Sequence, residues 1–147
     1  MSNFERVLRS LTHQMHRVIA SSSHASIAEL ERLRRSGMQV DAVDECGLTC
    51  LFMAAAGGER EVCEWLVAHG ADVDARNPED GRSPLHAACA AGHVAVAAQL
   101  LSAGASSTAR DAEGLTPAEL AHRALQLDVV RVFVDHSRQE LRAAKKK

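Results

Sequence analysis

The feature that most constrains this chain is an internal repeat with a period of about 33 residues. The segment Gly47-Leu-Thr-Cys-Leu-Phe recurs 34 residues later as Gly81-Arg-Ser-Pro-Leu-His, and 33 residues further on as Gly114-Leu-Thr-Pro-Ala-Glu. A second marker, the run around Gly70, recurs around Gly104. Two markers that keep one spacing along most of the chain indicate stacked supersecondary units, each of which buries its apolar face against its neighbours.

Each unit carries the signals of two short helices. Ser83 and Thr116 each precede a proline, which places an N-cap oxygen and a pre-set first residue at the start of a helix. This first helix is rich in Ala and should end at a glycine in a left-handed conformation. A second helix follows, with Leu and Val at helical spacing and a glycine cap. We expect first helices over 51–57 and 85–91, second helices over 61–69 and 94–103, breaks at Gly58 and Gly92, and caps at Gly70 and Gly104.

Composition agrees with a helical fold. Aromatic residues make up only 3% of the chain, whereas 26 of its 147 residues are Ala. Strands of an all-β sandwich or barrel are enriched in aromatic and β-branched residues, while Ala favours closely packed helices. The apolar content of 46% is too high for a disordered chain. The sequence therefore predicts an all-α domain.

The segment from Gly81 to His93 closely resembles the ankyrin-repeat signature G-x-T-P-L-H-x-A-A-x-x-G-H. The resemblance implies an all-α ankyrin-repeat solenoid of stacked helix-turn-helix units with projecting β-turn loops. We expect about four repeats in one domain over 1–144. The units are an N-terminal capping repeat with a long first helix (1–43), internal repeats over 44–76 and 77–110, a C-terminal capping repeat (111–144) and a basic tail (145–147).

The chain departs from the family pattern at several positions. Cys50 and Phe52 replace the Pro and His of the second unit, and Glu119 and Leu125 replace the His and the inter-helix Gly of the last unit. The turn over 77–81 has one extra residue, which predicts a distorted fingertip. The first unit lacks the Thr-Pro-Leu-His box.

A long first helix is predicted at the N-terminus. Apolar residues between Phe4 and Ile19 follow the i, i+3, i+4, i+7 spacing of an amphipathic helix, and Ser2 with Glu5 forms a capping-box pattern. An Arg- and Ser-rich N-terminus is also typical of organelle transit peptides, but we interpret the segment as a structural helix. Such a helix could fold back over the first repeat as a lid, or protrude as a docking element.

The histidines and cysteines do not form a recognisable catalytic or metal-binding pattern. The resemblance implies that His86 bonds the neighbouring turn and that His93 is structural. The pair His86 and Cys89 lacks an orienting third group, and we expect His13 and His16 to face solvent. The four cysteines do not have the spacing of zinc ligands. We therefore expect no enzyme activity, no cofactor and no metal.

Charge and hydropathy limit the classes of partner. The net charge is −2 and the pI is near 6.4, so no overall attraction to nucleic acid or to an anionic membrane is expected. The longest apolar run, over 51–58, is far too short to span a membrane. Cysteines without a C-x-x-C pair favour a reducing compartment. We expect a cytoplasmic monomer; the basic tail leaves a nuclear location as the alternative.

The resemblance implies that function lies on the concave face, where turns and first helices bind partners. We predict a protein-binding module that acts as an adaptor or occluding inhibitor. The alternative is a structural scaffold or self-assembling subunit that uses the long N-terminal helix. The acidic turns favour a partner with a basic patch. The predicted protein-binding residues are Glu45, Cys46, Leu48, Glu79, Asp80, Arg82, Ala90, Ala91, Ala112, Glu113, Leu115 and Arg123.

Overall fold

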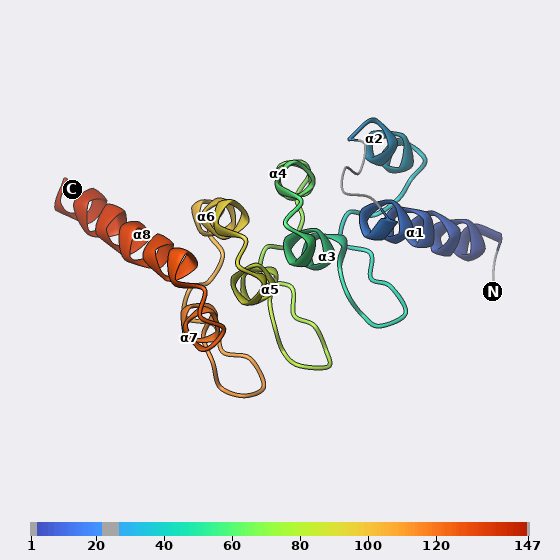
Figure 1. The fold of residues 1–147 in the computed structure, drawn as a ribbon. Helices are drawn as coiled ribbons and strands as arrows, with labels where there is room; N and C mark the ends of the chain where they lie inside the picture. Colours follow the sequence, from blue (N-terminus) through green and yellow to red (C-terminus); the bar gives the residue numbers. More distant parts are fainter. Residues whose placement is uncertain (1–2, 22–26, 147) are drawn as a thin grey trace.

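A computed structural model describes residues 3–21 and 27–146 of the chain. These residues form eight helices and no strand, as expected for an all-α fold (Figure 1). The helices are α1 (Asn3–Ser21), α2 (Ile27–Arg35), α3 (Cys50–Gly57), α4 (Arg60–Ala68), α5 (Pro84–Ala91), α6 (Val94–Ser102), α7 (Pro117–Arg123) and α8 (Leu127–Lys145).

The helices stack in two rows. The inner row consists of α1, α3, α5 and α7, and the outer row consists of α2, α4, α6 and α8 (Figure 1). The segments 36–49, 69–83 and 103–116 project from the inner row on one side of the stack, and we call them the first, second and third fingers (Figure 1). The arrangement confirms the prediction of stacked helix pairs whose turns project from one side.

The helix boundaries follow the local signals in the sequence. The side chains of Ser83 and Thr116 cap α5 and α7 in complete capping boxes, each with a proline in the first turn. Gly58 and Gly92 have left-handed φ angles of 73° and 80°, as predicted. Gly58 also needs to lack a side chain, because a Cβ there would come within 2.5 Å of His93 Nδ1. Leu125 takes the same left-handed region, with φ of 59°, in place of the family's glycine.

The second finger contains the extra residue that the sequence predicts. The Gly81 N–H donates to the carbonyl of Asn77, four residues earlier, whereas the Gly47 and Gly114 N–H groups donate to carbonyls three residues earlier. The wider turn moves the tip residues of the second finger relative to those of its neighbours.

One apolar core runs through the stack from α1 to α8. Leu51, Leu66, Leu85 and Leu100 are each at most 1% exposed, which confirms that they fill the space between helix layers. Each helix pair thus buries its apolar face against the next pair, as a solenoid requires.

Helix α1 is the first member of the inner row. It packs against α3 and α2, with Met15 and Ile19 buried in the common core. The C-terminal half of α1 is therefore neither a lid nor a detached element. Val7 is 54% exposed, so the predicted apolar face is only partly used. The side chains of Phe4, Leu8 and Leu11 and the Ser2–Glu5 capping box lie outside the described residues.

The prediction for His16 was wrong. The ring is only 6% exposed, with Nδ1 2.8 Å from the Thr12 carbonyl oxygen and Nε2 3.0 Å from the Leu48 carbonyl oxygen. His86 makes the equivalent contact to Leu115 in the third finger, also at 3.0 Å. The first unit therefore contains the box histidine, within the altered sequence His13-Gln-Met-His16. His13 is exposed, as expected.

Candidate functional site

A groove with a volume of about 440 Å³ lies between α3, α5 and the second finger. Its floor is apolar and consists of small residues except for one aromatic side chain, Phe52. Its rim on the second finger is polar. Small side chains on the floor leave room for side chains of a partner. The lining residues are Phe52 and Ala56 on α3, Ala87, Ala90 and Ala91 on α5, and Asn77, Asp80 and Arg82 on the second finger.

Phe52 occupies the position that holds a structural histidine in the next unit. The equivalent His86 is fully buried; its Nδ1 accepts the Ser83 N–H at 3.2 Å, and its Nε2 donates to the Leu115 carbonyl at 3.0 Å. This confirms the structural role expected of His86. A phenyl ring cannot make these bonds. The chain thus gives up one hydrogen bond between units and places an apolar ring against the groove.

Arg82 connects the second and third fingers. Its guanidinium lies 3.5 Å from the carboxylate of Asp80, 3.4 Å from that of Asp111 and 3.6 Å from that of Glu113. The Ala112 N–H also donates to the Asp80 carbonyl at 2.8 Å. The two fingers are therefore held together at the rim of the groove.

The predicted binding residues include four acids, Glu45, Glu79, Asp80 and Glu113, and two of them are paired with arginine. Asp80 contacts Arg82, and Glu113 accepts from Arg123 at 2.5 and 3.2 Å. The hydrogen bond from Arg123 lowers the pKa of Glu113 below its usual value. Glu45 and Glu79 are exposed and form no ion pair within the described part of the chain. Of these four acids, Glu45 and Glu79 are therefore the two whose charge no cation among the described residues offsets.

Asp111 fixes the shape of the third finger. Burial alone would raise the pKa of this carboxyl, but the N–H groups of Leu115 and Glu113 and the Arg82 guanidinium outweigh burial and lower it. The Oδ1 atom accepts these two N–H groups at 2.9 and 3.0 Å. The Asp-x-x-Gly sequence thus builds a rigid turn from one carboxylate.

The twelve predicted binding residues fall into three groups. Asp80, Arg82, Ala90 and Ala91 line the groove, and Glu79 lies at the tip of the second finger beside it. Ala112, Glu113 and Leu115 lie on the third finger, with Arg123 on α7 joined to them through its ion pair with Glu113. Glu45, Cys46 and Leu48 belong to the first finger, where Glu45 and Cys46 line a separate cleft beside α1.

The prediction omitted four groove residues: Phe52, Ala56, Asn77 and Ala87. The sequence contained an indication for Phe52, because this residue replaces the histidine of the family's Pro-Leu-His sequence in its unit. The extra residue in the second finger was a signal for Asn77, whose side-chain oxygen accepts the Glu79 N–H at 2.9 Å.

His93 and the three buried cysteines have structural surroundings. His93 Nε2 donates to the Ala56 carbonyl of the preceding unit at 3.0 Å. Burial raises the pKa of the Cys50, Cys63 and Cys89 thiols to about 12, so these thiols remain protonated and unreactive. Among residues 3–21 and 27–146, no three His, Cys, Asp or Glu side chains are grouped as a metal site would need. Over the same ranges, no helix has both the length and the apolar character required to cross a membrane.

Comparison with known proteins gives several relatives. The chain is 34% identical over 108 residues to inactive serine/threonine-protein kinase TEX14 of Bos taurus, which covers 74% of this chain and 7% of the relative. It is 35% identical over 88 residues to protein phosphatase 1 regulatory subunit 27 of Mus musculus, which covers 60% of this chain and 56% of the relative. It is 32% identical over 76 residues to NF-kappa-B inhibitor cactus of Drosophila yakuba, which covers 52% of this chain and 16% of the relative.

In each of these comparisons, the matched region spans less than two thirds of the relative's own length. A family model of ankyrin repeats, in three copies, matches residues 15–111 and 74–144. The matched ranges include the two helix starts in which a capping residue precedes a proline, Ser83-Pro84 and Thr116-Pro117. They also include the inter-helix glycines and all three fingers. The chain belongs to the ankyrin-repeat family.

Proposed function

We propose that this chain binds a partner protein in the groove beside Phe52, and acts as an adaptor or as an inhibitor that occludes its partner. Ankyrin repeats are non-catalytic modules that bind other proteins. We accordingly propose no enzyme activity for the chain.

The observation that carries the proposal is the exchange of a structural histidine for Phe52. A chain selected for stability alone would keep a side chain that hydrogen-bonds the second finger, as His86 does for the third finger. The phenyl ring instead adds apolar area to a groove whose other floor residues are alanines. Positions that break a local rule of the fold are concentrated at functional sites.

The rim of the groove favours a partner that combines an apolar anchor with a basic side chain. The anchor would fill the space between Phe52 and Ala91, and a Lys or Arg would lie beside Glu79, which has no ion pair within the described residues. An exposed charge of this kind contributes little to affinity but speeds association at low salt. We propose a cytoplasmic monomer, with the nucleus as the alternative location.

Two relatives support a regulatory role. One is named as a regulatory subunit of protein phosphatase 1 and another as an inhibitor of NF-kappa-B. Both names describe proteins that act on a partner. We carry over this mode of action and not the identity of either partner.

The alternative of self-assembly through the N-terminal helix has less support. Part of α1 is used within the chain, because Met15 and Ile19 are buried in the common core. Light scattering at several concentrations would distinguish a monomer from an assembly.

Affinity capture with matched arginine variants tests the groove. Ala91 lies exposed on the groove floor, so Ala91→Arg should fill the groove and abolish recovery of a partner that wild type recovers from source lysate. Ala68→Arg makes the same change on exposed outer-row surface at the end of α4 and should recover the partner normally. Equal recovery by both variants, measured by quantitative mass spectrometry, would show that the groove is not the binding site.

A further inference from the structure

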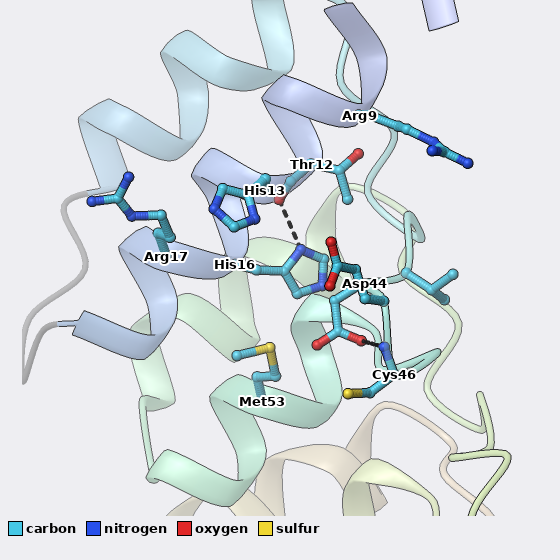
Figure 2. Close-up of a pocket in the computed structure, with 10 residues that line it drawn as sticks. Arg9, Thr12, His13, His16, Arg17, Asp44, Cys46 and Met53 are labelled. Carbon is cyan, nitrogen blue, oxygen red and sulfur yellow. Dashed lines mark hydrogen bonds between the residues drawn. The ribbon is translucent and has the colours of Figure 1, made fainter. Parts of the chain in front are cut away.

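A second and larger cleft, with a volume of about 800 Å³, lies between α1 and the first finger. One wall is formed by α1, and the other by the first finger with Met53 of α3 (Figure 2). The cleft is separate from the groove beside Phe52, because the two have no lining residue in common. Three of its lining residues, Arg9, Thr12 and His13, lie on the turns of α1 that precede His16.

The α1 wall carries a row of basic side chains. Arg9, His13 and Arg17 follow one another at intervals of four residues, so they lie along one side of the helix, and all three are exposed. Neither arginine forms an ion pair within the described residues. Most arginines of the repeat units, in contrast, bond carboxylates or carbonyls, as Arg76, Arg82 and Arg123 do. The exposed side chains of this row can contact an anionic partner in the cleft.

The opposite wall is acidic and apolar. Asp44 is already used within the finger, since its Oδ1 accepts the N–H groups of Cys46 and Leu48 at 2.9 Å. Glu45 is exposed, and Val43 is 52% exposed. A ligand must therefore present carboxylates to α1 only, and apolar groups to the finger.

We propose that this cleft binds an extended acidic segment of a partner protein, in which acidic and apolar residues alternate. Side chains of an extended chain alternate between two sides, and every second residue recurs after about 6.6 Å. Residues four apart on a helix recur after about 6 Å. Three alternate carboxylates of such a segment therefore match Arg9, His13 and Arg17, while the intervening side chains pack on Val43 and Met53.

The inference concerns a site other than the groove beside Phe52, and a defined peptide tests it without any captured partner. The probe is a fluorescein-labelled seven-residue peptide that alternates Glu with Leu. One control peptide has the same composition with its Glu residues consecutive, and another has Lys in place of each Glu. Fluorescence anisotropy should show that the alternating acidic peptide binds at least about tenfold more tightly than either control.

Two double variants with the same change in charge show where the peptide binds. Arg9→Ala with Arg17→Ala should weaken binding about tenfold, because two charge pairs are lost at an exposed site. Arg131→Ala with Arg138→Ala, on exposed positions of α8, should leave binding unchanged. Circular dichroism checks that each variant folds, and the single variant Arg9→Ala serves if the double variant does not.

Alkylation of Cys46 gives an independent readout within the cleft. Cys46 is the exposed cysteine of the four, whereas Cys50, Cys63 and Cys89 are buried. The alternating peptide should slow the reaction of Cys46 with iodoacetamide in wild type and not in the Arg9 and Arg17 variant. Equal binding of all three peptides, equal loss in both double variants, or no binding and no protection of Cys46 would overturn the inference.

Discussion

Leu85→Ala is expected to lower the free energy of unfolding by about 2–5 kcal/mol. Leu85 is fully buried in α5, in the middle of the inner row. The substitution removes apolar contacts and leaves a cavity that the flanking helices α3 and α7 can close only in part. A loss of this size is a large fraction of the stability of a small domain.

Unfolding of the Leu85→Ala variant should remain a single transition. Each unit of a solenoid is stabilised by its neighbours, and a stack this short has no end that can stay folded once its centre is lost. Chemical denaturation followed by circular dichroism measures both quantities. Leu141→Ala is the matched control, since Leu141 is 64% exposed on α8 and should change the free energy by less than about 0.5 kcal/mol. Wild-type stability in Leu85→Ala would mean that the repeat register assigned to α5 is wrong.

The second large effect is expected at His86, where His86→Ala should cost about 3 kcal/mol. The ring is fully buried and joins the capping box of α5 to the third finger through Ser83 and Leu115. Its removal leaves a cavity, and the Ser83 N–H loses the Nδ1 atom that accepts its hydrogen bond. His122→Ala, at an exposed position of α7, should have little effect in the same denaturation experiment.

His86 should also make stability depend on pH. Burial lowers the pKa of His86 below the usual 6.5, and the Leu115 carbonyl and the Asp111 carboxylate oppose this only in part. The unfolded chain therefore binds a proton at this histidine more readily than the folded chain does. The stabilisation is complete above about pH 6.5 and is lost as the pH falls from there toward the lower folded-state pKa. The difference in melting temperature between wild type and His86→Ala should shrink between pH 7.5 and 5.

Most of the fold follows from the sequence because its signals are local. A cap, a proline and a glycine define each helix end within a few residues, and the period repeats that information in successive units. The first unit is the exception. His13-Gln-Met-His16 retains the histidine of the box but not its Ser-Pro start, so only the contact between His16 and Leu48 identifies it.

The residues of the candidate site are harder to predict from the sequence than the fold is, because the site depends on which residues of different repeat units come into contact. Arg82 and Asp111 are 29 residues apart, and no local pattern predicts that they pair. The acidic turn residues were predicted from the resemblance to the ankyrin family, and ion pairs with arginine neutralise two of them, Asp80 and Glu113. The shape of the cleft beside α1 depends on the angle at which α1 packs against the first finger. The spacing of the repeats in the sequence does not determine this angle.

Phe52 is expected to serve binding at the expense of a structural hydrogen bond, and the dissociation constant of the Phe52→His variant measures this. A histidine at this position can donate to the Arg82 carbonyl as His86 does to that of Leu115, so the melting temperature should stay the same or rise. Phe52→Leu keeps the groove apolar and should bind the captured partner almost as well as wild type. In isothermal titration calorimetry, we expect Phe52→His to bind that partner at least about tenfold more weakly than wild type. Wild-type affinity in a folded Phe52→His variant would show that the phenyl ring does not contribute to binding.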